Sequence, residues 1–381
     1  MSFGDLPCTV ISVRVLVTGG AGFIGSHLVA RLVARRDDVV VLDSLEHQVH
    51  NGSSGAQLDG VEFIRADVGD VEAAGRALLG ADAVVHLAAA VGVGQSMYEI
   101  DRYVRANAMA TATFLERMLA GPTRPTRLVV ASSMSIYGEG EYECGEHGAV
   151  APRPRSEAQL IARAWECVCP QCGSELQPRP TRETKPLIPT SIYAITKRDH
   201  EEMCLVVGEA YAIPTVALRF FNVYGPGQAL SNPYTGVAAI FASRLLNGRP
   251  PVIFEDGRQT RDFIHVSDIV EGIVAALESE DAVGHAINLG TGRATSIDEL
   301  AVALARGLGI EIEPERTEQY RAGDIRHCFA DTARASQLLG FQAHVELEDG
   351  MARLAEWLEG QEAEDRVEAA TEELAVRGLT R

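Results

Sequence analysis

A tyrosine and a lysine four residues apart form the clearest candidate for acid/base chemistry in the sequence. In Tyr193-Ala-Ile-Thr-Lys197 this spacing places both side chains on one face of a helix. A nearby ammonium group favours the phenolate, so we expect the pKa of Tyr193 to be lowered toward the working range. Such a phenolate would accept a hydroxyl proton. Taken alone the motif is common, and most instances are simple surface pairs.

The segment Gly19–Gly25 has the glycine spacing of a dinucleotide-binding turn. Its Gly-x-Gly-x-x-Gly pattern follows the apolar run Val13–Val17 and precedes apolar residues at helical spacing. Glycines there permit a sharp turn, close approach of a pyrophosphate and tight packing of helix on strand. Asp43 ends a second apolar run, where a carboxylate would bind the ribose hydroxyls and repel a 2′-phosphate. These features predict NAD rather than NADP; the alternative is a structural turn with a solvated Asp43.

Four of the seven cysteines lie within residues 144–172. Cys144-Gly-Glu-His147 and Cys169-Pro-Gln-Cys172 each place two metal-binding side chains three positions apart. Two such pairs predict a closed Cys3His zinc site, structural rather than catalytic because no coordination position stays open. Cys167 is an alternative to His147 as the fourth ligand, and the spacing does not decide between them. The cysteines could also be unrelated loop residues.

The elements that would position these residues alternate along the chain. Buried strands are predicted at 13–17, 39–42, 61–66, 82–87, 127–131 and 214–220, and long helices at 95–119 and 193–211. This alternation predicts an α/β fold, a Rossmann-type doubly wound parallel sheet, whose ligands bind at the carboxyl edge. Asp67, Val68 and Ala88 follow predicted strand ends. Ser133 follows the strand at 127–131 and should reach the same edge.

We divide the chain into three parts. An NAD-binding domain is predicted at 1–220, with a small metal-binding insertion at about 139–190, where prolines, charges and cysteines interrupt the pattern. A smaller C-terminal substrate domain is predicted at 221–360, and parts of 266–305 are expected to return to the first domain. The acidic C-terminal tail, 361–381, keeps only a thin apolar stripe, which favours a solvated helix over a functional one.

Composition limits the partners. With 381 residues the chain can bury a large core, and its formal net charge of -19 argues against nucleic acid and anionic membranes. No apolar run reaches the roughly 18 residues of a membrane helix. Residues 1–12 lack the basic start and apolar core of a signal peptide. We therefore expect a cytoplasmic protein.

Five blocks spread over roughly residues 13–358 resemble the extended branch of the short-chain dehydrogenase/reductase superfamily, which contains nucleotide-sugar epimerases and dehydratases. The blocks are Thr-Gly-Gly-Ala-Gly-Phe-Ile-Gly, Ala-Ser-Ser-Met-Ser-Ile-Tyr-Gly, Tyr-Ala-Ile-Thr-Lys, Arg-Phe-Phe-Asn-Val-Tyr-Gly-Pro and Arg-Asp-Phe-Ile-His-Val. The resemblance implies Tyr193 as the base and Lys197 as the residue that binds the nicotinamide ribose and tunes Tyr193. It implies that Ser133 bonds the reacting sugar hydroxyl, and that Asn107 orders a water and the helix.

The same resemblance implies the binding residues. Substrate diphosphate and sugar would be held by Asn222, Arg261 and Arg321, because guanidinium groups pair with phosphate through two hydrogen bonds. For Arg261 the alternative is an ion pair with Asp262. NAD would contact Gly19, Gly22, Phe23, Ile24, Gly25, Asp43, Asp67, Val68, Ala88, Tyr193 and Lys197.

Met134-Ser135 separates this chain from the sugar 4,6-dehydratases of the family, which carry an Asp-Glu pair there. Neither side chain can protonate a leaving hydroxyl or remove a C5 proton. The resemblance therefore implies a 4-epimerase with tightly bound NAD. The Cys/His insertion and the run Leu230–Gly236 resemble dTDP-L-rhamnose 4-epimerases, which interconvert dTDP-L-rhamnose and dTDP-6-deoxy-L-talose. The alternatives are a UDP-glucose or UDP-glucuronate 4-epimerase and a non-catalytic NAD-binding regulatory protein.

A homodimer is also implied, because the helices at 95–119 and 193–211 correspond to those that pair as a four-helix bundle in the family. Leu115, Met118 and Leu119 are candidates for that interface, or they face the sheet.

Overall fold

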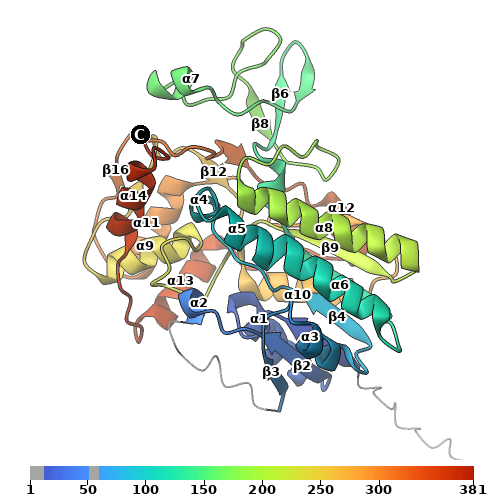
Figure 1. Ribbon diagram of the computed structural model, residues 1–381. Coiled ribbons are helices and arrows are strands. Elements are labelled where there is room, and N and C mark those ends of the chain that lie inside the picture. Colours follow the sequence, from blue (N-terminus) through green and yellow to red (C-terminus); the bar gives the residue numbers. More distant parts are fainter. Residues whose placement is uncertain (1–12, 51–59) are drawn as a thin grey trace, which may run out of the picture.

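The computed structural model describes residues 13–50 and 60–381, and its centre is a seven-stranded parallel sheet (Figure 1). The strand order is β14-β9-β5-β4-β1-β2-β3. The strands are β1 (Arg14–Thr18), β2 (Asp38–Asp43), β3 (Glu62–Arg65), β4 (Ala83–His86), β5 (Arg127–Ser133), β9 (Thr215–Phe220) and β14 (Ala286–Leu289). Their continuous apolar runs suit strands buried on both faces. The predicted doubly wound α/β fold is confirmed.

Helices cover both faces of this sheet. Val15 and Val17 of β1 belong to one apolar cluster, with side chains of α1 (Phe23–Ala34) and α10 (Val266–Glu278). Leu16 points to the other face and joins a cluster formed with α3 (Val71–Leu78), α6 (Ala110–Ala120) and α8 (Ile192–Tyr211). The alternation follows from the period of a strand. Thus α10 and β14, which come late in the chain, complete the layers built by the first half.

The helix predicted at 95–119 is not continuous. It consists of α4 (Val93–Ser96), α5 (Ile100–Tyr103), a π-helix η1 (Val104–Met109) and α6. The Ser96 hydroxyl donates to the carbonyl of Val93, and Glu99 has non-helical backbone angles, so the first turn stops. The predicted helix is therefore interrupted at residues 97–99, and helical structure, including the π-helix, then continues from Ile100 to Ala120 alongside α8 (Figure 1).

A second unit packs around its own apolar cluster, contributed mainly by three helices. These are α9 (Val237–Leu246), α11 (Ile297–Gly307) and α13 (Leu347–Leu358). Short strands accompany them: β10 (Asn222–Tyr224) pairs with β13 (Phe263–His265), β11 (Val252–Ile253) with β16 (Glu315–Arg316), and β12 (Thr260–Arg261) with β15 (Thr295–Ser296) and β17 (His327–Cys328). Three short elements lie between those already described: α2 (His47–His50) after β2, the 3-10 helix η2 (Met134–Tyr137) after β5, and α12 (Ala333–Leu339) after β17.

The cysteine-bearing insertion is a small module that projects from the top of the molecule in Figure 1. It contains an antiparallel sheet of β6 (Glu141–Cys144), β7 (Gly148–Val150) and β8 (Gln177–Arg179). The helix α7 (Glu157–Ile161) lies between β7 and β8 in the chain. Its apolar cluster is small and includes three cysteines. A core of this size needs further fastening.

The C-terminal tail differs from the solvated helix that we expected. It forms α14 (Val367–Val376), in which Ala370 and Leu374 are buried. A bridge between Thr380 and Arg321 ties the chain end to the second unit (Figure 1). The prediction was wrong because the thin apolar stripe has a packing partner, which only the folded chain supplies.

For Leu115, Met118 and Leu119 we considered a dimer interface or the face toward the sheet, and the structure shows the second. Leu115 and Met118 are buried in the cluster beneath α6, and Leu119 packs against the same cluster. They therefore face the sheet. Exposed apolar side chains on the same elements are Val104 and Met109 on η1 and Ile195 and Val206 on α8.

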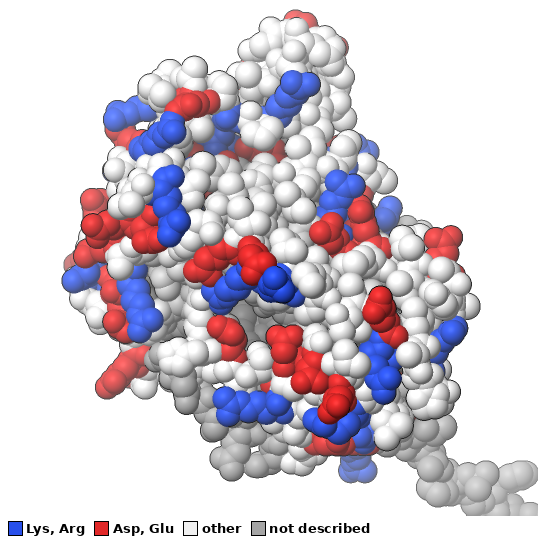
Figure 2. All heavy atoms as spheres, in the orientation of Figure 1, with Lys and Arg blue, Asp and Glu red and all other residues white. Residues whose placement is uncertain are grey.

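The charged surface shows both signs. On the face drawn in Figure 2, acidic and basic side chains lie next to one another over the described residues. Among the helices that the structure describes, none has the length and apolar character needed to cross a membrane.

Candidate active site

The turn between β1 and α1 leaves room for a ligand at the helix N-terminus. Gly19 has a φ of +70°, and a Cβ there would lie 2.8 Å from the backbone nitrogen of Ala88. A Cβ on Gly25 would lie 2.1 Å from the carbonyl oxygen of Gly19, so no side chain fits between turn and helix. No described side chain caps α1 at Gly22. The N–H groups of the first helical turn are thus left for an anion, which fits the pyrophosphate of a dinucleotide.

Asp43 is held at the carboxyl end of β2. Its two carboxylate oxygens accept hydrogen bonds from the backbone nitrogens of Ala21 (3.0 Å) and Leu45 (2.8 Å). The side chain is therefore fixed beside the glycine turn, and each oxygen keeps acceptor capacity for a hydroxyl group. This arrangement fits the adenosine ribose of NAD.

Tyr193 lies in the first turn of α8. The hydroxyl of Ser191 caps this helix by accepting from the backbone nitrogen of Ala194, and the nitrogen of Tyr193 donates to Ser96 Oγ at 3.0 Å. The Tyr193 ring is 9% exposed. Burial raises the pKa of Tyr193 to about 12, and hydrogen bonding with Ser133 partly offsets that rise. The expected lowering of this pKa is therefore wrong in this structure.

The position of Lys197 explains that difference. Its ammonium group donates to the carbonyl of Ala131 on β5 and lies 3.1 Å from Nδ1 of His200. Burial lowers the pKa of Lys197 to about 8. The ammonium group of Lys197 contacts β5 and His200 and does not stabilise the phenolate of Tyr193. The pKa of Tyr193 is therefore set mainly by burial.

Ser133 and Asn107 complete the predicted tetrad in different ways. Ser133 ends β5, and its hydroxyl accepts from the backbone nitrogen (3.2 Å) and hydroxyl (2.9 Å) of Ser135. Asn107 is fully buried on η1. Its carboxamide accepts from the nitrogen of Ala90 (2.7 Å) and donates to the carbonyl of Ala90 (3.0 Å) and to Thr196 Oγ1 (3.0 Å). Asn107 thereby joins the chain after β4 to helix α8.

The residues predicted for the substrate come from the second unit and its borders. Arg261 donates to the carbonyl groups of Ile325 and Arg326, and not to Asp262, whose carboxylate accepts from Thr291 and Gly292. The ion pair considered for Arg261 is therefore absent.

Arg321 and Asn222 have contrasting surroundings. Arg321 donates to Asp324 at 2.8 Å and stacks on the Phe254 ring at 4.5 Å. The Oδ1 atom of Asn222 is buried and has no hydrogen-bond partner among the described residues. An acceptor left unpaired in a cavity wall is free for a ligand hydroxyl.

One cavity of about 1180 Å³ brings these groups together. Its lining includes every predicted NAD residue (Gly19, Gly22, Phe23, Ile24, Gly25, Asp43, Asp67, Val68, Ala88, Tyr193, Lys197) and every predicted substrate residue (Ser133, Asn222, Arg261, Arg321). Asn107 is not part of the lining. The volume exceeds the roughly 300–1,000 Å³ of a typical small-molecule pocket, as two ligands side by side require.

The sequence interpretation missed part of this cavity. Val367, Ala370, Thr371, Leu374 and Leu379 of the C-terminal segment also line it. The only signal in the sequence was the apolar spacing of the stripe in α14, which we had assigned to a solvated helix. His200 and Ser96, which hold Lys197 and Tyr193, carried no signal of their own.

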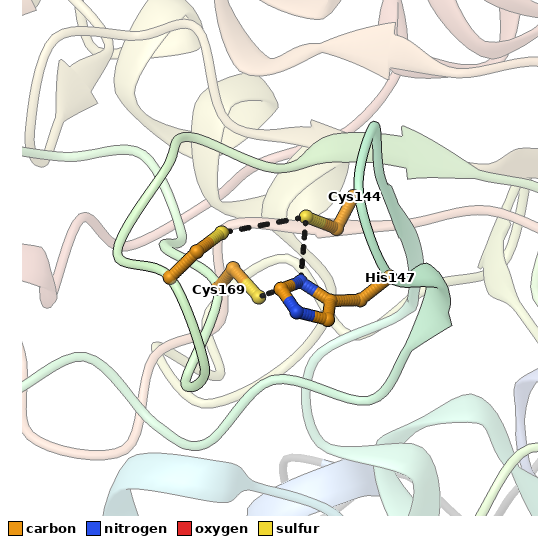
Figure 3. Close-up of side chains that lie close together, drawn as sticks. Cys144, His147 and Cys169 are labelled. Atoms are coloured by element: carbon orange, nitrogen blue, oxygen red, sulfur yellow. Dashed lines mark hydrogen bonds between the residues drawn. The ribbon is translucent and has the colours of Figure 1, made fainter.

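The module holds the predicted metal ligands together. Single donor atoms of Cys144, His147, Cys169 and Cys172 all lie within 4.8 Å of one another. Figure 3 shows the His147 ring between Cys144 and Cys169, with Nδ1 at 3.4 Å and 3.6 Å from the two sulfurs. Cys167 instead lies against Tyr142, at 3.4 Å from the phenol oxygen. The donor set and its closeness fit a tetrahedral metal ion.

A buried ionic network fastens this module to the second unit. The guanidinium of Arg326 is fully buried and pairs with Glu166 of the module and with Glu255 and Asp256. Glu139, at the start of the module, accepts from the backbone nitrogen of Arg326 at 2.8 Å. Since the carbonyl of Arg326 accepts from Arg261, the module adjoins the predicted substrate side of the cavity.

Comparison with known proteins identifies the family. The profile described as the NAD dependent epimerase/dehydratase family matches residues 15–157 and 164–290. A dTDP-L-rhamnose 4-epimerase from Burkholderia thailandensis is 36% identical, over 91% of this chain and 94% of its own. A UDP-glucose 4-epimerase from Mycolicibacterium smegmatis is 34% identical, over 90% and 98% of the two chains.

A solved relative agrees with these matches. The UDP-glucuronic acid 4-epimerase from Bacillus cereus, in complex with UDP-glucuronic acid and NAD, superimposes with a TM-score of 0.74 at 29% identity, over 91% of this chain and 99% of its own. The chain therefore belongs to the NAD-dependent epimerase/dehydratase family, in the extended short-chain dehydrogenase/reductase branch that includes the nucleotide-sugar 4-epimerases.

Proposed function

We propose that this protein is an NAD-dependent nucleotide-sugar 4-epimerase that interconverts dTDP-L-rhamnose and dTDP-6-deoxy-L-talose. The observation that carries the proposal is the meeting of Tyr193, Lys197 and Ser133 in one cavity with the dinucleotide turn. A non-catalytic NAD-binding protein has no need for that set of three.

The chain's own residues would move the proton. Tyr193 lines the same cavity as Ser133 and would accept the proton of the sugar 4-hydroxyl and return it later. Reversible hydride exchange at C4 of the sugar is the chemistry that NAD would supply when bound. The nicotinamide ribose would be held by Lys197, and Asp43 would hold the adenosine ribose. Burial of Tyr193 and Lys197 keeps water away from the transfer.

Dehydration is not supported by the residues beside Ser133. Met134 lines the cavity, and Ser135 donates its hydroxyl to Ser133. A thioether and an alcohol cannot supply the acid and base needed to expel a hydroxyl group. Inversion at C4 needs only the tyrosine and the dinucleotide.

The proposal also specifies which sugar nucleotide is the substrate. The relative from Burkholderia thailandensis supports dTDP-L-rhamnose. The UDP-glucose and UDP-glucuronic acid 4-epimerases, which match nearly as well, support a UDP-sugar as the second candidate.

We also propose a structural zinc ion in the module and a homodimer. The gathered Cys144, His147, Cys169 and Cys172 support the metal, since a small apolar cluster gains stability from coordination. Exposed Ile195 and Val206 on α8, with Val104 and Met109 on η1, support pairing through these helices.

Tyr193→Phe should lower kcat by roughly 10²-fold or more, because the positioned base is lost while the ring still fills its place. Tyr211→Phe, at the exposed end of the same helix, is the control and should be unchanged. Turnover and bound NAD are measured together. A Tyr193→Phe enzyme with near-normal kcat would refute the assignment of the base.

Protein purified without added zinc should contain about one zinc per chain, and Cys169→Ser should lose it, because one of four ligands is removed. Cys167→Ala should keep its zinc, since that thiol lies outside the cluster. Metal content is read by elemental analysis. Absence of metal from the unmodified protein, or equal loss in both variants, would contradict the proposed site.

Purified protein without added reductant should convert dTDP-L-rhamnose into its 4-epimer until the two reach equilibrium. UDP-glucose is supplied in a separate reaction, and both are followed by chromatography. Conversion of UDP-glucose alone would overturn the dTDP-L-rhamnose proposal and keep the 4-epimerase class. Consumption of external NADH in proportion to product would overturn the class itself.

A further inference from the structure

The C-terminal helix α14 has an inner and an outer face. Val367, Ala370 and Leu374 lie at helical spacing and line the cavity. Ala370 and Leu374 are 9% and 6% exposed, whereas Val376 on the outer face is 80% exposed. The helix therefore contributes an apolar surface to the cavity that holds the predicted substrate residues.

The segment before α14 is anchored to α9. The Asp365 carboxylate, 3% exposed, lies 3.3 Å from the guanidinium groups of both Arg244 and Arg249. Close by, the side-chain amide of Asn247 donates to the carbonyl of Ala363 at 2.8 Å, and the backbone nitrogen of Glu364 donates to Ser231. A buried carboxylate with two cationic partners holds the chain in one place.

The segment after α14 is anchored on both sides of Arg321. Tyr320 and Arg381 exchange backbone hydrogen bonds of 2.8 Å and 3.0 Å, and the nitrogen of Ala322 donates to the carbonyl of Leu379 at 2.8 Å. Arg321 is one of the residues predicted to hold the substrate. The chain end thus forms a short antiparallel pair with the Arg321 segment, and α14 lies between two fixed points.

The inner face of α14 lies near Tyr193. A Cβ on Gly94 would be 3.5 Å from both terminal methyl carbons of Leu374, so the leucine packs directly on α4. On the same short helix, Ser96 accepts from the backbone nitrogen of Tyr193. The guanidinium of Arg377 also stacks on Tyr98, at 4.2 Å from the ring centre, just after α4. The apolar wall therefore packs on the short helix that also contacts the backbone of Tyr193.

The chemistry of this wall restricts what can touch it. Of the five cavity-lining residues of the segment, four are aliphatic and Thr371 has the only hydroxyl. A hydroxymethyl or carboxylate group against such a surface would lose its water without gaining partners. A methyl group would gain burial.

We propose that residues 361–381 form the specificity wall of the sugar pocket, and that Leu374 and Ala370 select a sugar with a methyl group at C6 over one with an oxygen there. This inference depends on the proposed 4-epimerase function, because that function places the sugar beside Tyr193. The C-terminal segment is then a substrate-binding element and not an acidic appendage.

The test compares dTDP-L-rhamnose with dTDP-L-mannose, which differ only by the C6 hydroxyl. Binding is measured by calorimetry in the Tyr193→Phe protein, so that turnover does not interfere, and kcat/KM is measured in the active enzyme. The unmodified chain should prefer the 6-deoxy sugar by roughly 10- to 100-fold. Leu374→Ser should reduce that preference to within about 3-fold, while Val376→Ser on the outer face should keep it.

Bound NAD and the melting temperature show whether each variant is folded. Ala370→Ser is a smaller change on the same wall, and it should also lower the preference for the 6-deoxy sugar. Equal binding of the two nucleotides by the unmodified chain, or an unchanged preference in folded Leu374→Ser and Ala370→Ser, would overturn the inference and leave 4-epimerisation standing. A 6-deoxy preference in binding without any C4 inversion would support the wall and overturn the proposed reaction.

Discussion

The buried carboxamide of Asn107 is the contact on which the geometry of the site depends. It pairs with both backbone groups of Ala90, after β4, and with Thr196 on α8. These bonds fix the helix that carries Tyr193 and Lys197 relative to the carboxyl edge of the sheet. Loss of the carboxamide would leave buried polar groups unpaired, at a cost of about 1–3 kcal/mol each. The π-helix η1 places this side chain inward, in keeping with the frequent use of such turns at functional sites.

Much of this arrangement could be predicted from the sequence, because local chemistry determines it. The glycine turn follows from backbone space, because a side chain at Gly25 would clash with the carbonyl oxygen of Gly19. The strands follow from continuous apolar runs, and the placement of Tyr193 and Lys197 in the first turns of one helix follows from the sequence pattern. The ligand cluster follows from the short spacing within each Cys/His pair, although the exclusion of Cys167 needed the fold.

The contacts that could not be predicted from the sequence involve residues that are distant in the chain. Lys197 contacts Ala131 and His200 rather than acting on Tyr193, and Arg261 donates to carbonyl groups near residue 325. The stripe on α14 finds its partner at Gly94. Three apolar residues at helical spacing cannot tell whether a helix faces solvent, a core or a cavity, so the sequence alone led to the wrong interpretation there.

The Cys/His module and the C-terminal segment both lie next to the side of the cavity that contains Arg261 and Arg321. One reaches the Arg261 region through the buried Arg326 network, and the other pairs with the chain around Arg321. Both are attached to a fold that already contains the dinucleotide turn and Tyr193, and both border residues predicted to hold the substrate.

In the proposed reaction, hydride leaves C4 of the sugar and returns to that same carbon. The most direct measurement uses dTDP-L-rhamnose with deuterium at C4, incubated in ordinary water with purified protein and no added cofactor. The 4-epimer formed should retain its deuterium at C4, as mass spectrometry and NMR would show. Epimer whose deuterium has been replaced by solvent hydrogen would contradict the proposed reaction.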